Sequence, residues 1–163
     1  PPWPAPGYSW YPIGGLDGRD PGALTAAAGA VLAWADEHAA DAASIAFLGF
    51  SQGGAMSLQL LRLAPERVAF AVNLSGYAAG GELPGDAILA ETRPPVFWGR
   101  GSADEVIPES AIAHTAEWLP EHSELIGRIY PGMGHSVSQE ELTDLHHFLT
   151  LRYAAPTTAA PAS

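Results

Sequence analysis

Apolar residues recur along this chain with two different periods. Short continuous apolar runs predict strands that are buried on both faces, as in a parallel sheet. Longer stretches, in which apolar residues return every three or four positions, predict amphipathic helices. The predicted strands are residues 44–50, 68–74, 95–98 and 124–130, and the predicted helices are residues 23–38, 53–63, 109–119 and 139–151.

The segments between these elements are marked by residues that begin or break regular structure. Asp20-Pro21 is typical of a helix start, with an acidic cap and a proline at the first helical position. Residues 76–92 hold several glycines, so we expect mostly loop there, with a turn of helix near Ile88. Residues 154–163 contain only Ala, Pro, Thr and Ser, which predicts a disordered tail.

Strands that alternate with helices predict the α/β class, with a mostly parallel sheet flanked by helices and joined by right-handed crossovers. The chain has 163 residues, of which 47% are hydrophobic, enough for one core. We therefore expect a single catalytic domain over residues 1–153. In such sheets the functional side chains gather at the carboxyl ends of the strands.

A candidate nucleophile follows the first predicted strand directly. Residues 49–53 read Gly-Phe-Ser-Gln-Gly, which places Ser51 on a sharp turn between a strand and a helix. The main-chain amide of Gln52 would then point at the oxygen of a reacting carbonyl group and stabilise its negative charge. A glycine-rich turn with a buried serine is the alternative, and the strand before and the helix after the motif favour the nucleophile.

A candidate base and a candidate acid follow two later strands. His135 lies in a glycine-flanked loop after the fourth predicted strand, where it can reach a serine hydroxyl at the same sheet edge. Asp104 and its neighbour Glu105 follow the third strand, and either carboxylate can orient an imidazole. The other histidines fall in helical stretches or at a helix end, and His146 and His147 are helix neighbours whose side chains diverge.

Composition excludes several classes of function. Seven basic residues against eighteen acidic ones give a net charge of −11, which argues against nucleic-acid binding. The longest apolar run is too short to span a bilayer, so we expect no stable membrane insertion. The chain has no cysteine, which excludes thiolate metal sites and a cysteine nucleophile. No targeting signal is visible, and the cytoplasm is the default location.

Three segments together resemble the phospholipase/carboxylesterase family of α/β-hydrolases, which includes acyl-protein thioesterases. They are residues 49–54 (Gly-Phe-Ser-Gln-Gly-Gly), 101–108 (Gly-Ser-Ala-Asp-Glu-Val-Ile-Pro) and 132–136 (Gly-Met-Gly-His-Ser), joined by Ser-Trp-Tyr at 9–11. The order Ser, Asp, His is that of α/β-hydrolases and favours Asp104 over Glu105. The resemblance implies hydrolysis of carboxylic esters or thioesters by a homodimer that needs no cofactor or metal.

The chain departs from the family pattern in two places. Arg100 stands where the family often has histidine, which affects only local packing. Family members also carry several strands ahead of the aromatic segment, and a loop after one of them supplies a second oxyanion donor. Residues 1–21 offer no such strands, and the apolar strand 44–50 has no predicted partner on one side. We therefore expect a carboxyl-terminal portion of a longer enzyme.

The predicted reaction is hydrolysis of small to medium carboxylic esters through an acyl-enzyme on Ser51. Trp10, Tyr11 and Met133 are the candidates for contacts with a small-molecule ester. The same machinery fits an acyl-protein thioesterase or a lysophospholipase, because all three share the oxyanion chemistry. A non-catalytic fragment or binding module on a hydrolase scaffold is the remaining alternative.

Overall fold

The computed structural model of the chain describes residues 8–12 and 20–153. The predicted tail over residues 154–163 lies outside the described residues. Four strands form one parallel sheet in the order β1-β2-β3-β4, which confirms the predicted α/β class. The strands are β1 (Ile45–Phe50), β2 (Val68–Leu74), β3 (Pro95–Gly101) and β4 (Glu124–Tyr130), and the helices are α1 (Pro21–His38), α2 (Gln52–Leu63), α3 (Pro84–Thr92), α4 (Glu109–His122) and α5 (Gln139–Tyr153).

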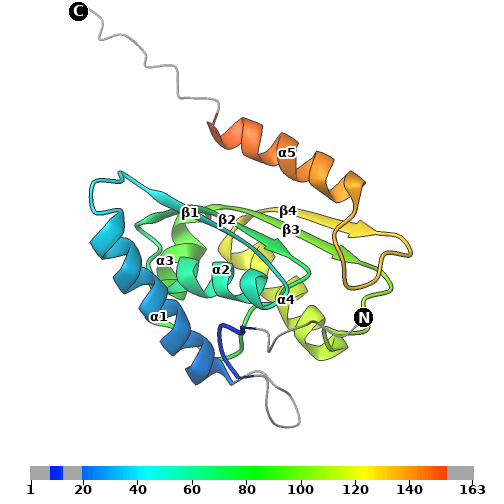
Figure 1. The fold of residues 1–163 in the computed structure, drawn as a ribbon, viewed down its shortest axis with the longest axis horizontal. Helices are drawn as coiled ribbons and strands as arrows, with labels where there is room; N and C mark the ends of the chain where they lie inside the picture. Colours follow the sequence, from blue (N-terminus) through cyan, green and yellow to red (C-terminus); the bar gives the residue numbers. More distant parts are fainter. Residues whose placement is uncertain (1–7, 13–19, 154–163) are drawn as a thin grey trace, which may run out of the picture.

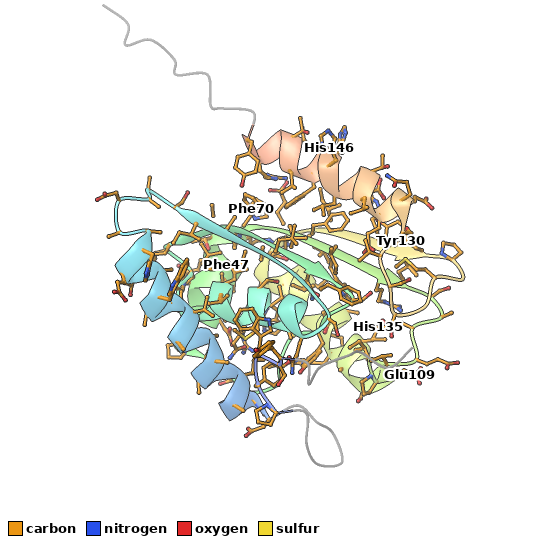
Figure 2. All side chains as sticks on the ribbon, in the orientation of Figure 1. Phe47, Phe70, Glu109, Tyr130, His135 and His146 are labelled. Carbon is orange, nitrogen blue, oxygen red and sulfur yellow. The ribbon has the colours of Figure 1, made fainter. Side chains whose placement is uncertain are left out.

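Helices cover the sheet on both faces, with α1 to α4 on one side and α5 on the other (Figure 1). Each strand lies beside the next in sequence, so α2, α3 and α4 cross the same face in turn. Figure 2 shows Phe47 on the side of α1 and α2, and Phe70 on the side of α5. The rings of Phe70 and Phe97 pack edge-on or tilted against Phe148 of α5, which holds this helix on the sheet.

Helix boundaries follow local chemistry. The side chain of Asp20 accepts a 2.8 Å hydrogen bond from the amide of Gly22, and Pro21 begins α1, as the sequence predicts. Helix α4 continues to His122, beyond the predicted end at residue 119. Pro120 lies in its last turns, and the Ser123 hydroxyl bonds back to a main-chain carbonyl of that turn at 2.6 Å.

Residues 76–92 are more helical than the sequence predicts. The glycines indicate loop, but α3 runs for nine residues from Pro84. Pro84 has the fixed backbone angle that suits a first helical position, and the Asp86 carboxylate accepts a 2.9 Å bond from the Leu83 amide. Leu89 is fully buried against the core. Tertiary packing of one apolar residue therefore outweighs the weak local pattern.

Strand β1 is less buried than its apolar sequence predicts. Among the described residues it pairs with β2 alone, so it lies at an edge of the sheet. Leu48 is 55% exposed and Phe50 is 40% exposed, which corrects the prediction of burial on both faces. The reason is the position of α5, whose contacts concentrate over β3 rather than over β1. The unpartnered side that the sequence indicates is present in the structure.

Candidate active site

Ser51 occupies a strained turn between β1 and α2. Its backbone angles are φ 57° and ψ −117°, a region that a residue with a side chain rarely adopts. Strain of this kind costs about 1–3 kcal/mol and persists only where the surroundings enforce it. Here the Ser51 amide donates to the carbonyl of Leu74 at 2.8 Å, which fixes the turn against β2. The hydroxyl therefore stands at the carboxyl end of the sheet.

Glycines allow the strand and the helix around Ser51 to approach each other. A side chain at Gly49 would overlap the backbone of Gly53, so residues two before and two after the serine touch directly. A side chain at Gly54 would in turn overlap the Asn73 amide oxygen of β2. The glycines of the motif are thus required by contact distances.

One imidazole lies between the serine and a carboxylate. His135 Nε2 is 2.8 Å from Ser51 Oγ, and His135 Nδ1 is 2.8 Å from Asp104 Oδ2. Figure 2 shows His135 at the end of the sheet to which the strands point. The three residues that the sequence predicts as nucleophile, base and acid therefore meet at one edge. Glu105, the rival carboxylate, is exposed to solvent.

The environment of Asp104 keeps its carboxyl group ionised. Burial raises its pKa, but hydrogen bonds from His135 and from the amides of Val106 and Ile107 outweigh burial and lower the pKa overall. The Asp104 side chain is 1% exposed, whereas that of His135 is 15% exposed. A buried anion facing Nδ1 places the imidazole proton on that nitrogen and leaves Nε2 free to accept a proton from the serine.

Hydrogen bonds join the loop after β3, which carries Asp104, to the loop after β4, which carries His135. The amide of Ala103 donates to the Met133 carbonyl at 2.9 Å, and the amide of Gly132 donates to Ser102 Oγ at 2.8 Å. The rings of Phe50 and His135 lie 4.8 Å apart, which limits the imidazole on its other side. The loop after β3 and the loop after β4 are therefore joined by hydrogen bonds on the side of the site.

The amino end of α2 supplies a positive electrostatic environment beside Ser51. Gln52 is the first residue of this helix, and the first amides of a helix have no acceptor within the helix. These N–H groups and the helix dipole favour negative charge at this point. An oxyanion formed next to the Ser51 hydroxyl would lie against the donors of this turn.

Comparison with known proteins assigns the chain to a described family. The family model of phospholipases and carboxylesterases matches residues 7–153 of the chain. The chain belongs to the phospholipase/carboxylesterase family. The predicted resemblance is thereby confirmed, and the fold is that of the α/β-hydrolases.

Relatives in this family have names that point to esterases and thioesterases. Acyl-protein thioesterase 1 of Debaryomyces hansenii is 35% identical over 70% of this chain and 50% of its own length. A probable carboxylesterase of rice, Oryza sativa subsp. japonica, is 31% identical over 86% of this chain and 57% of its own length. The crystal structure of Arabidopsis thaliana SOBER1 is 25% identical, with a TM-score of 0.73 over 88% of this chain and 73% of that one. The chain thus spans about half the length of the curated relatives it matches.

The three residues predicted to contact substrate lie in different surroundings. Trp10 is 57% exposed and lines an apolar cavity of about 260 Å³ that also contacts Phe50 and Gly53, on either side of Ser51. Tyr11 is 3% exposed and belongs to the core. Met133 is half-buried, two residues before His135. Contact of these residues with substrate stays a prediction.

Two features of the site have no signal in the sequence. The side chain of Gln52 bonds the backbone of the aromatic segment more than forty positions earlier. Glu141 of α5 is fully buried, and its carboxylate lies against Gly99 of β3 with no hydrogen-bond partner among the described residues. Burial raises the Glu141 pKa, and the nearby main-chain amide of Ser138 opposes this shift only in part. Both features depend on contacts between distant elements.

The described residues hold no group of three His, Asp or Glu side chains arranged to bind a metal ion. His146 and His147 are both exposed on α5. Within the same part of the chain, no helix is both long and apolar enough to cross a bilayer.

Proposed function

We propose that this chain supplies the catalytic centre of a serine carboxylesterase that hydrolyses small to medium carboxylic esters. The observation that carries the proposal is the position of the His135 ring, with one nitrogen 2.8 Å from Ser51 Oγ and the other 2.8 Å from Asp104 Oδ2. The family match supports hydrolysis of ester or thioester bonds as the class of reaction. Residues 1–153 form the proposed catalytic domain.

Acylation begins with attack of Ser51 Oγ on the substrate carbonyl carbon. His135 Nε2 accepts the hydroxyl proton as the new carbon–oxygen bond forms, and Asp104 stabilises the imidazolium that results. The main-chain N–H of Gln52 donates to the oxyanion of the tetrahedral intermediate. The imidazolium then gives its proton to the leaving alcohol as the carbon–oxygen bond to that alcohol breaks.

Deacylation repeats these steps with water. His135 Nε2 removes a proton from a water molecule, which attacks the acyl-enzyme carbonyl. Collapse of the second tetrahedral intermediate returns the proton to Ser51 Oγ and releases the carboxylic acid. No redox step or cofactor enters this sequence, because the bonds formed and broken are those of acyl transfer alone.

A thioesterase is the second candidate. The 35% identical relative from Debaryomyces hansenii is named acyl-protein thioesterase 1, and attack on a thioester uses the same nucleophile and oxyanion donor. The cavity of about 260 Å³ that Trp10 shares with Phe50 favours a short or medium acyl group over a long one. The two reactions differ in the leaving group, an alcohol or a thiol, so the ratio of rates for an ester and a thioester of the same acyl chain separates the two functions.

Covalent labelling tests the nucleophile directly. A fluorophosphonate should label the wild-type chain once, and Ser51→Ala should abolish the label. Ser136→Ala is the matched control, because this exposed serine follows His135 in the same loop. Rates with p-nitrophenyl acetate, hexanoate and dodecanoate and with an acyl thioester then separate an esterase from a thioesterase. Labelling that survives in Ser51→Ala, or an unlabelled wild type, would contradict the proposal.

A further inference from the structure

The Gln52 side chain is hydrogen-bonded to the backbone of the aromatic segment, residues 8–12. Its Oε1 accepts a 3.0 Å hydrogen bond from the Trp10 amide, and its Nε2 donates a 2.8 Å bond to the Tyr11 carbonyl. The two bonds hold two neighbouring residues of the segment, one through its N–H and the other through its carbonyl. A residue whose amide lies at the proposed oxyanion site therefore also holds a segment more than forty positions away.

This contact requires an amide side chain of the length of glutamine. One end must accept from an N–H and the other must donate to a carbonyl, which neither a carboxylate nor an apolar side chain can do. A second anchor lies beyond the first, because the hydroxyl groups of Tyr11 and Tyr77 are 2.7 Å apart in the core. The segment is thus fixed on both sides of Tyr11, with Trp10 directed outward.

Trp10 is placed by these bonds beside the nucleophile. Its indole nitrogen is 3.9 Å from the position that a side chain at Gly53 would occupy, so the ring lies over the first turn of α2. It lines the 260 Å³ cavity together with Phe47 and Phe50. It also lines an adjoining apolar cavity of about 550 Å³, which contacts Val31 and Trp34 of α1. The indole is therefore a shared wall of two apolar cavities, one that reaches Phe50 and Gly53 on either side of Ser51 and one that lies against α1.

We propose that the Gln52 side chain is a positioning residue that holds Trp10 as the wall of the acyl-binding site. The proposal rests on the proposed function, since it assigns the acyl group of the same substrate to the cavity beside Ser51. The main-chain amide of Gln52 contacts the reacting oxygen, whereas its side chain acts through Trp10. One residue thus couples the reacting carbonyl to selectivity for the acyl chain.

The consequence is a change in acyl selectivity. An acetyl group is too short to reach an apolar wall beyond the reacting carbonyl, whereas a hexanoyl chain extends along it. One net intramolecular hydrogen bond shifts an equilibrium about fivefold. We therefore expect Gln52→Met, which keeps the side-chain length and removes both bonds, to lower the hexanoate-to-acetate ratio of kcat/KM at least about fivefold.

The experiment compares this ratio in four proteins: wild type, Gln52→Met, Trp10→Ala and the double variant. If Gln52 acts through Trp10, both single variants lower the ratio and the double variant lowers it no further. Acrylamide quenching, with Trp10→Phe as the reference for this one indole, should show Trp10 more accessible in Gln52→Met. An unchanged ratio in Gln52→Met, or single effects that add fully, would overturn the proposal.

Gln59→Met is the matched control on the same helix. The Nε2 of this buried glutamine donates a 2.8 Å bond to Thr25 of α1, so the variant loses a comparable tether away from Trp10. Its selectivity ratio should equal that of the wild type, and a fall of equal size would overturn a specific role for Gln52. If the wild type takes no fluorophosphonate, the proposed function and the selectivity proposal fail together. Quenching then still decides whether Gln52 positions Trp10.

Discussion

Replacement of Asp104 by asparagine tests the relay most directly. The Asp104 carboxylate faces three donors, since Oδ1 accepts from the amides of Val106 and Ile107 and Oδ2 faces His135 Nδ1. An asparagine that keeps its oxygen toward the two amides must turn its NH₂ group toward the imidazole. Nδ1 must then accept, and the imidazole proton moves to Nε2.

The expected loss follows from this change of tautomer. A protonated Nε2 facing Ser51 Oγ at 2.8 Å cannot accept the hydroxyl proton, so general-base catalysis is lost while the shape of the site is kept. A tautomer error of this kind lowers kcat about 10⁴-fold, which corresponds to about 5.4 kcal/mol of activation free energy. Stability should change far less, because asparagine has nearly the volume of aspartate.

The assay is hydrolysis of p-nitrophenyl acetate, with the rate of fluorophosphonate labelling as a second readout of the nucleophile. Glu105→Gln is the matched control, because it neutralises the neighbouring carboxylate, which is exposed. It should retain activity close to that of the wild type. A kcat in Asp104→Asn within tenfold of the wild type, or an equal loss in Glu105→Gln, would refute the assigned orientation of the imidazole.

Three further predictions concern stability and association. Arg62→Met, which leaves the half-buried carboxylate of Asp86 without its buried partner, should lower the free energy of unfolding in urea by about 3 kcal/mol. Arg67→Met removes an exposed ion pair with Asp36 and should lower the free energy of unfolding by at most about 1 kcal/mol. Equal losses in the two variants would contradict the idea that burial of Arg62 makes its ion pair the stronger one. Because burial raises the Glu141 pKa, stability should fall as pH rises from the ordinary carboxyl value through the raised one. Glu141→Gln should flatten that slope and add about 1–2 kcal/mol at pH 8, and an unchanged slope would exclude this residue as its source. Leu48→Lys should reduce self-association, measured by light scattering, more than Leu151→Lys does. Both side chains are 55% exposed, but only Leu48 lies on the edge strand β1. Equal effects of the two variants would argue against association through this edge.

Much of the fold and of the proposed site could be predicted from local patterns. The spacing of apolar residues predicts the parallel sheet and all the helices except α3. The spacing and the length of a segment separate strands from helices without knowledge of distant contacts. Ser51, Asp104 and His135 are predicted to lie together because each follows a strand, and the carboxyl ends of parallel strands meet at one edge. The structure adds the two 2.8 Å contacts that join them.

The sequence by itself therefore determined the features that are encoded within a few neighbouring residues, such as a helix period or a residue at the end of a strand. Tertiary structure alone decided the rest: the exposure of Leu48, the extent of α3, the buried carboxylate of Glu141 and the bonds from Gln52 to residues 10 and 11. Each of these depends on which element packs against which, a free energy summed over residues far apart in the chain. Such contacts leave no periodic trace in the sequence.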